Sequence, residues 1–89
     1  MSTSFAVPAP RSAMLLRRRI ATYFVGGTET IPALVGALEG RPVHELSVDV
    51  KDGVRESSMV CAVLLAAEET GPLLDRLREL PSVVSAELA

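Results

Sequence analysis

The chain has few of the side chains from which enzyme active sites are built. Its 89 residues include no tryptophan, asparagine or glutamine, one histidine and one cysteine. A Ser-His-Asp or Cys-His relay would therefore have to be built around His44, whose simplest interpretation is a packed or edge side chain of a strand. The Cys and His residues lack zinc-site spacing, and the acids are too scattered for calcium. We expect no catalysis, no metal and no cofactor.

Long apolar runs are also missing. The run at residues 13–16 is too short for a secretory signal, and arginines follow it rather than precede it. No run is long enough to span a membrane, so no membrane partner is expected. Cys61 cannot close an intrachain disulfide and lies among apolar residues, which indicates a core side chain in a cytoplasmic protein.

Acidic residues are absent from the first part of the chain. Arg11 and the three arginines at 17–19 precede any acid, whereas all eleven Asp and Glu residues lie from Glu29 onward. We expect residues 1–17 to form a flexible basic arm ahead of one domain at residues 18–89. Such an arm could contact nucleic acid, but the acidic body would repel phosphate and disfavours that partner.

A repeat organises the rest of the chain. Residues 29–34 read Glu-Thr-Ile-Pro-Ala-Leu, and residues 69–74 read Glu-Thr-Gly-Pro-Leu-Leu. Each copy follows a stretch rich in β-forming residues, opens a helical stretch and is followed by a second stretch rich in β-forming residues. This order predicts two successive strand-helix-strand units. The four predicted strands cover residues 20–25, 43–50, 58–66 and 83–88.

Both predicted helices have an apolar stripe at helical spacing. The stripes consist of Ile31, Leu34, Val35 and Leu38, and of Leu73, Leu77 and Leu80. Thr30 is expected to cap the first helix and Thr70 or Gly71 the second. Gly40 and Pro81 are expected to end them.

The two strands between the helices differ in pattern. Residues 43–50 alternate, with His44, Leu46 and Val48 on one face and polar side chains on the other, which is typical of a strand wetted on one side. Residues 58–66 are apolar on both faces and predict a central strand. Asp52-Gly53 between them is a hairpin signal.

These elements predict an α+β fold. Two βαβ units with right-handed crossovers and an antiparallel hairpin between them make a ferredoxin-like βαββαβ sandwich, with an antiparallel four-stranded sheet in order 4-1-3-2 and two helices on one face. The helix-free face would expose apolar side chains, and burying each Val or Leu is worth about 1.5–3 kcal/mol. We therefore expect a homodimer or higher homo-oligomer through the sheet face or edge.

The two copies differ at the junction between strand and helix. Gly26, Gly27 and Thr28 stand where the second copy has Ala66, Ala67 and Glu68. Glycines let backbone N–H groups approach a ligand, but a plain tight turn would use the same residues, so both interpretations stay open. Glu29 and Thr30 match Glu69 and Thr70, which indicates a role at the helix start in both copies.

Three stretches carry a resemblance to a known family. The strand at 20–25 entering the glycine junction, the helix at 31–38, and the stretch at 73–80 before Val83-Val84 resemble the ACT domain over residues 18–89. Within that family the chain looks most like the short acetolactate synthase regulatory subunit. The resemblance implies a dimeric regulatory module that binds an amino acid at its interface. The implied ligand contacts are Gly26, Gly27, Thr28, Glu29 and Thr30 at the junction, with His44 and Ser47 across the interface.

The leading functional hypothesis follows from this resemblance. The chain would be a non-catalytic module that senses an amino acid, such as valine, isoleucine or leucine, and modulates a catalytic enzyme subunit such as acetolactate synthase in branched-chain amino acid biosynthesis. Two alternatives stay open. The chain could be a purely structural subunit that docks on a catalytic chain, or a small ferredoxin-fold enzyme.

Overall fold

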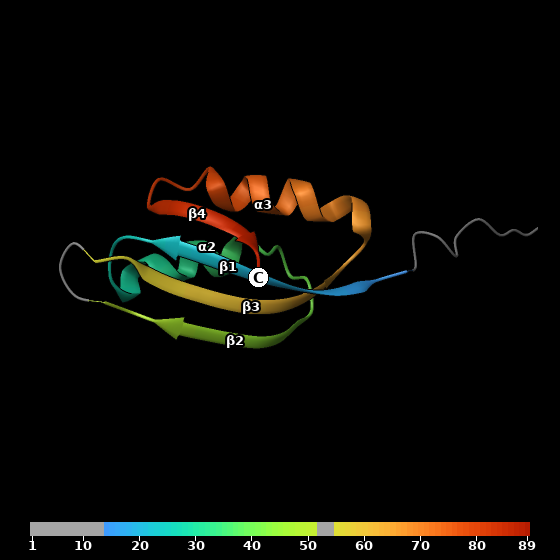
Figure 1. Cartoon of the computed structure of the whole chain (residues 1–89), viewed down its shortest axis with the longest axis horizontal. Coiled ribbons are helices and arrows are strands. Elements are labelled where there is room, and N and C mark those ends of the chain that lie inside the picture. Colours follow the sequence, from blue (N-terminus) through green and yellow to red (C-terminus); the bar gives the residue numbers. More distant parts are fainter. Residues whose placement is uncertain (1–13, 52–54) are drawn as a thin grey trace, which may run out of the picture.

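The strands form one antiparallel sheet with the predicted order. The computed structural model describes residues 14–51 and 55–89. Within them the strands run β2-β3-β1-β4 across the sheet (Figure 1). This order is 4-1-3-2 read from the other edge, and it confirms the ferredoxin-like α+β fold. In chain order the elements are β1 (Leu16–Phe24), the 3-10 helix η2 (Thr28–Thr30), α2 (Ile31–Gly36), β2 (Val43–Asp49), β3 (Ser57–Leu65), the 3-10 helix η3 (Ala67–Glu69), α3 (Thr70–Arg78) and β4 (Val83–Leu88).

The centre of the sheet is the pair β1 and β3. Their register runs without interruption from Leu16 opposite Leu65 to Phe24 opposite Ser57. β1 begins four residues before the predicted strand, so the three arginines at 17–19 lie within it. β3 has the central position that its two-sided apolar sequence predicts.

The core lies between one face of this sheet and both helices, and α2 passes behind the sheet in Figure 1. Alternate residues of a strand share a face, so the odd-numbered side chains of β3 point together toward the helices. Cys61 is among them, and burial raises the pKa of its thiol, in keeping with a core side chain. The core comprises Ile20, Phe24, Leu34, Ala37, Leu38, Met59, Cys61, Val63, Leu65, Leu73, Leu74, Leu77 and Ala86.

The helix-free face exposes less apolar surface than the sequence predicts. Its central residue Ala62 is only 1% exposed. Arg19 of β1 and Glu45 of β2 both lie opposite Ala62 in the register, and their ion pair, with 2.7 Å between Nη1 and Oε1, passes over it. Long charged side chains from the neighbouring strands thus cover the small residue at the centre of this face.

One group of exposed large apolar side chains lies on and around β2 and α2. α2 is only six residues long, and all seven residues of β2 are exposed. Since the short helix leaves β2 uncovered, the apolar side chains on that side of the sheet meet solvent. They are Val35, Val43, Leu46, Val48 and Val50.

A bulge changes the predicted alternation of β2. The register shifts between Val43 and Glu45, so His44 is an extra residue without a cross-strand partner. Val43, opposite buried Val63, lies on the same side of the sheet as Leu46 and Val48, which is the side on which the helices lie. The sequence predicts a regular alternation through His44, and the register instead leaves His44 without a cross-strand partner, because an inserted residue interrupts the two-residue period.

Two predictions fall outside the described residues, namely the hairpin turn at Asp52-Gly53 and most of the arm at 1–17. Among the helices within 14–51 and 55–89, none combines the length and the apolar character needed to cross a bilayer.

The position of the core predicts which side chains cannot be truncated without a large loss of stability. Leu77 of α3 is fully buried in the core, whereas Val84 of β4 is 53% exposed. Leu77→Ala should lower the free energy of unfolding by about 2–5 kcal/mol through lost burial and a cavity. Val84→Ala is the matched control and should change it by less than about 0.5 kcal/mol. Urea denaturation followed by circular dichroism measures both, and equal losses would contradict this core.

Candidate functional site

The junction after β1 is a compact turn that needs glycine at its first position. Val25 N–H donates to Ser82 O at 2.9 Å and fixes the turn to the loop before β4. Gly26 has a φ of +120°, and a Cβ there would lie 2.5 Å from Oγ1 of Thr30. L side chains rarely adopt this conformation. The turn itself therefore explains Gly26 without a ligand.

Glu29 closes the turn from within. The Gly27 N–H donates to Oε2 of Glu29 at 2.9 Å, and the Thr30 N–H donates to Gly27 O at 3.0 Å. The Gly27 hydrogen bond holds the pKa of the Glu29 carboxyl below its usual value. A backbone donor that a ligand anion could have used is thus already engaged by a carboxylate of the chain.

The second copy of the repeat has a similar arrangement that differs by one residue, because Glu69 accepts from Ala66 three residues before it, whereas Gly27 lies two residues before Glu29. The Ala66 N–H donates to Oε1 of Glu69 at 2.8 Å, and this bond lowers the pKa of Glu69, with a smaller contribution from Arg41. Arg41 Nη2 lies 3.3 Å from Oε2 of Glu69, and its Nη1 donates to Leu38 O at 3.1 Å. The equivalent glutamates therefore serve the helix start in both copies.

Thr30 has the N-cap position of α2 that the sequence predicts, whereas the predicted cap Thr70 or Gly71 is wrong, because α3 begins at Thr70 and Glu69 precedes it. Neither α2 nor α3 has a side-chain capping hydrogen bond at its first turn, and Thr30 and Thr70 already have helical backbone positions. A 3-10 turn precedes each α-helix, so the N–H groups that need a capping partner belong to Gly27 and Ala66, several residues before the α-helix begins. Glutamate reaches back over this distance more readily than threonine, which is why the carboxylates have the capping role.

One chain brings together only part of the predicted ligand site. Gly26, Gly27, Thr28, Glu29 and Thr30 form the continuous turn, and Thr28 and Glu29 are exposed. His44 and Ser47 are exposed on β2, two strands away from β1. Ser47 lies opposite Val60, which lies opposite Ala21. Strand spacing and rise separate Ser47 from Gly26 by about 10 Å across the sheet and about 16 Å along it.

The chemistry of the turn is that of an exposed carboxylate. Glu29 makes no ion pair with any Lys or Arg within the described ranges, and one of its oxygens is engaged by Gly27. Such a group attracts an ammonium and repels a phosphate. In residues 14–51 and 55–89 no three His, Cys, Asp or Glu side chains are close enough to hold a metal ion.

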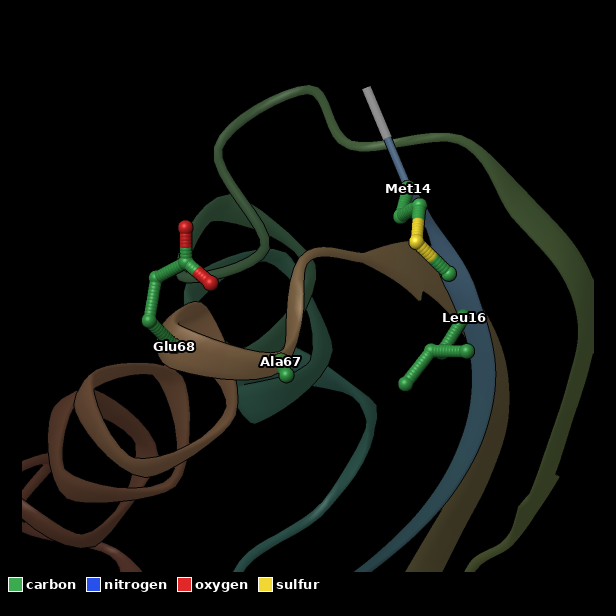
Figure 2. A pocket seen from close by; sticks show the side chains of 4 residues that line it. All are labelled: Met14, Leu16, Ala67 and Glu68. Atoms are coloured by element: carbon green, nitrogen blue, oxygen red, sulfur yellow. The ribbon is translucent and has the colours of Figure 1, made fainter. Parts of the chain in front are cut away.

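The sequence interpretation missed a hollow at the second junction. Met14, Leu16, Ala67 and Glu68 line a space of about 180 Å³, and Leu16 at the start of β1 points toward Ala67 (Figure 2). The signal was the apolar run at residues 13–16, which was assigned to the arm because β1 was predicted to begin later.

The two carboxylates predict an acid-sensitive helix start. A lowered folded-state pKa means that the stabilisation is present above the unfolded-state pKa of about 4.3 and is lost as the pH falls through the folded-state value. The double variant Glu29→Gln, Glu69→Gln should have a lower Tm than the parent at pH 7, and the two Tm values should converge toward pH 3. Glu68→Gln removes one carboxylate from an exposed glutamate that accepts no side-chain hydrogen bond from the described residues, and it is the control for the loss of charge alone. Parallel Tm curves for parent and double variant would contradict the capping role.

Comparison with known proteins adds evidence on the fold. No family model matches the sequence, and no curated protein matches it. The solution NMR structure of the ACT domain from GTP pyrophosphokinase of Chlorobium tepidum superposes with a TM-score of 0.71 at 14% identity, covering 84% of this chain and 86% of that one. The crystal structure of the same domain gives 0.70 at 14% identity, covering 85% and 100%. The chain therefore has the fold of the ACT domains that it resembles in sequence pattern.

Proposed function

We propose that this protein is a non-catalytic regulatory module of the ACT type that binds a small amino acid between two copies of the chain. The observation that carries the proposal is the likeness of 84% of the chain to the ACT domain of a GTP pyrophosphokinase, with a TM-score of 0.71. The glycine turn and its exposed carboxylate lie at the junction where the sequence resemblance puts ligand contacts.

The β2 edge, defined as the outer side of Val43–Asp49, is the proposed contact between the copies. β2 pairs only with β3, so its outer N–H and C=O groups have no partner in the part of the chain that is described. Val43, Leu46 and Val48 add an exposed apolar row beside α2. Antiparallel pairing with β2 of a second copy would satisfy these groups and bury the row.

We propose that the ligand site is divided between the two copies. A two-fold axis near Leu46 would put His44 of the second copy opposite Val48, which lies in register with Met59 and Thr22. Glu29 would hold the ligand ammonium, and His44 and Ser47 of the second copy are the contacts that the resemblance implies across the interface.

Ligand binding would act on a partner by favouring one dimer arrangement. It can shift that equilibrium only by its difference in affinity for the two arrangements. We propose valine, isoleucine or leucine as the ligand and a cytoplasmic enzyme such as acetolactate synthase as the partner. A role as a structural subunit on the same partner becomes the better account if no amino acid binds.

The proposed dimer can be tested at β2. Leu46→Arg should give a monomer at micromolar concentration, because it would bring two cations together at the two-fold axis. Val84→Arg introduces the same side chain at an exposed position of β4 and should leave the dimer intact. Sedimentation velocity measures both, and a monomeric parent protein would contradict the dimer.

The proposed ligand class can be tested by calorimetry with the common amino acids. Valine, isoleucine or leucine should give saturable heat, and Glu29→Gln should weaken binding about tenfold or more by removing the ammonium partner. Glu69→Gln loses the equivalent capping bond at the other junction and should retain affinity. No heat with any amino acid, from a protein shown to be dimeric, would remove the sensing role and leave the fold and dimer unaffected.

A further inference from the structure

A second part of the sheet has an uncovered edge. β4 pairs with β1 from Phe24 back to Ile20, and the last contact is the Ala89 N–H donating to Arg19 O at 2.9 Å. β1 continues beyond this point, past the end of β4 (Figure 1). Within residues 14–51 and 55–89, nothing pairs with Leu16–Arg18 on this side.

The backbone groups on this side are available for pairing. Successive residues of a strand direct their N–H and C=O groups to alternate sides. Arg19 O points toward β4, so the groups of Arg18 point toward β3 and those of Arg17 point to the uncovered side. Leu64, which lies opposite Arg17, donates its N–H to Pro42 O on the side away from β1, and this agrees with a pair that is not hydrogen-bonded between β1 and β3. An extended segment could therefore pair with Arg17 without breaking any bond of the sheet.

Positive charge is concentrated at the same place. Arg17, Arg18 and Arg19 line a hollow of about 270 Å³ together with Leu88 and Ala89. Arg19 is paired with Glu45, but Arg17 and Arg18 form no ion pair with any described residue. Nε of Arg18 is buried and has no hydrogen-bond partner. These unpaired guanidinium groups favour a carboxylate-bearing occupant.

The opposite face of the same stretch carries the apolar side chain of Leu16 together with Arg18. Met14 and Leu16 lie over the hollow beside Ala67 (Figure 2), and they are 66% and 37% exposed. A strand added at Arg17 would direct alternate side chains to the two faces. One set would meet Arg17 and Arg19, and the other would enter the space between Leu16 and Ala67.

We propose that the β1 edge, defined as the uncovered side of residues 14–19, binds an extended acidic segment of a partner protein by strand addition. The segment continues the line of β4, hydrogen-bonds to the backbone of Arg17, offers carboxylates to the arginines and inserts an apolar side chain beside Leu16. This surface is separate from the amino-acid site and from the β2 edge.

Charge decides among the possible occupants. A second copy paired through the same edge would bring two sets of three arginines together. Residues 1–13 contain Arg11 and no acid, so they offer the wrong charge as well. A nucleic acid would satisfy the arginines, but it would use neither the strand backbone nor the apolar hollow, which has Glu68 at its rim.

The test uses a fluorescein-labelled peptide, Ser-Glu-Val-Glu-Val-Glu-Ser, titrated with the full chain and followed by anisotropy. We expect saturable binding that weakens about tenfold in Arg17→Glu. Arg55→Glu makes the same charge change at an exposed arginine away from the β1 edge and should not weaken binding. The matching peptide with lysine in place of glutamate should not bind.

Strand addition is tested separately from charge attraction. In the parent chain, amide exchange at Arg17 should slow when the acidic peptide is bound, and NMR shift changes should centre on residues 14–19. Arg17→Pro removes the N–H as well as the charge and should bind about fivefold more weakly than Arg17→Gln. Absence of saturable binding, equal binding of the lysine peptide, shifts centred on β2, unchanged Arg17 exchange, or tighter binding of an oligothymidine would each overturn the proposal.

Discussion

The pairing of β1 with β3 is the constraint on which the other elements depend. These strands pair along the full length of each and carry most of the core side chains contributed by the sheet. β2 and β4 each have one neighbour only, and both helices pack on the face that the central pair provides. The centre of the sheet is therefore fully paired, and within residues 14–51 and 55–89 the outer strands have backbone groups without a partner.

The fold could be predicted because two independent signals agree. The repeat gives the order of elements, and the apolar period gives the face that each element buries. Predictions of local structure failed where a single residue alters the period of apolar side chains. An alternating pattern of apolar and polar residues does not reveal the bulge at His44. The three charged residues at 17–19 do not read as a strand, because it is their backbone pairing with β3, and not burial of their side chains, that makes them part of β1.

The candidate site was predictable only in part, for a physical reason. Glu29 and Glu69 occupy matching positions in the repeat, so a shared structural role could be inferred, and the structure assigns that role to their carboxylates rather than to the threonines. His44 and Ser47 are distant from Gly26 in one chain. Sequence periodicity describes one chain, and it contains no information on what a neighbouring molecule contributes.

The β2 edge and the β1 edge lie on opposite sides of the sheet, and this affects how many partner segments a dimer could bind at once. Two chains joined through β2 would form a continuous eight-stranded sheet with one arginine-rich stretch near each outer end. A partner with two acidic segments on a linker long enough to span the sheet would then bind both ends at once, and its apparent affinity would exceed that of either contact alone.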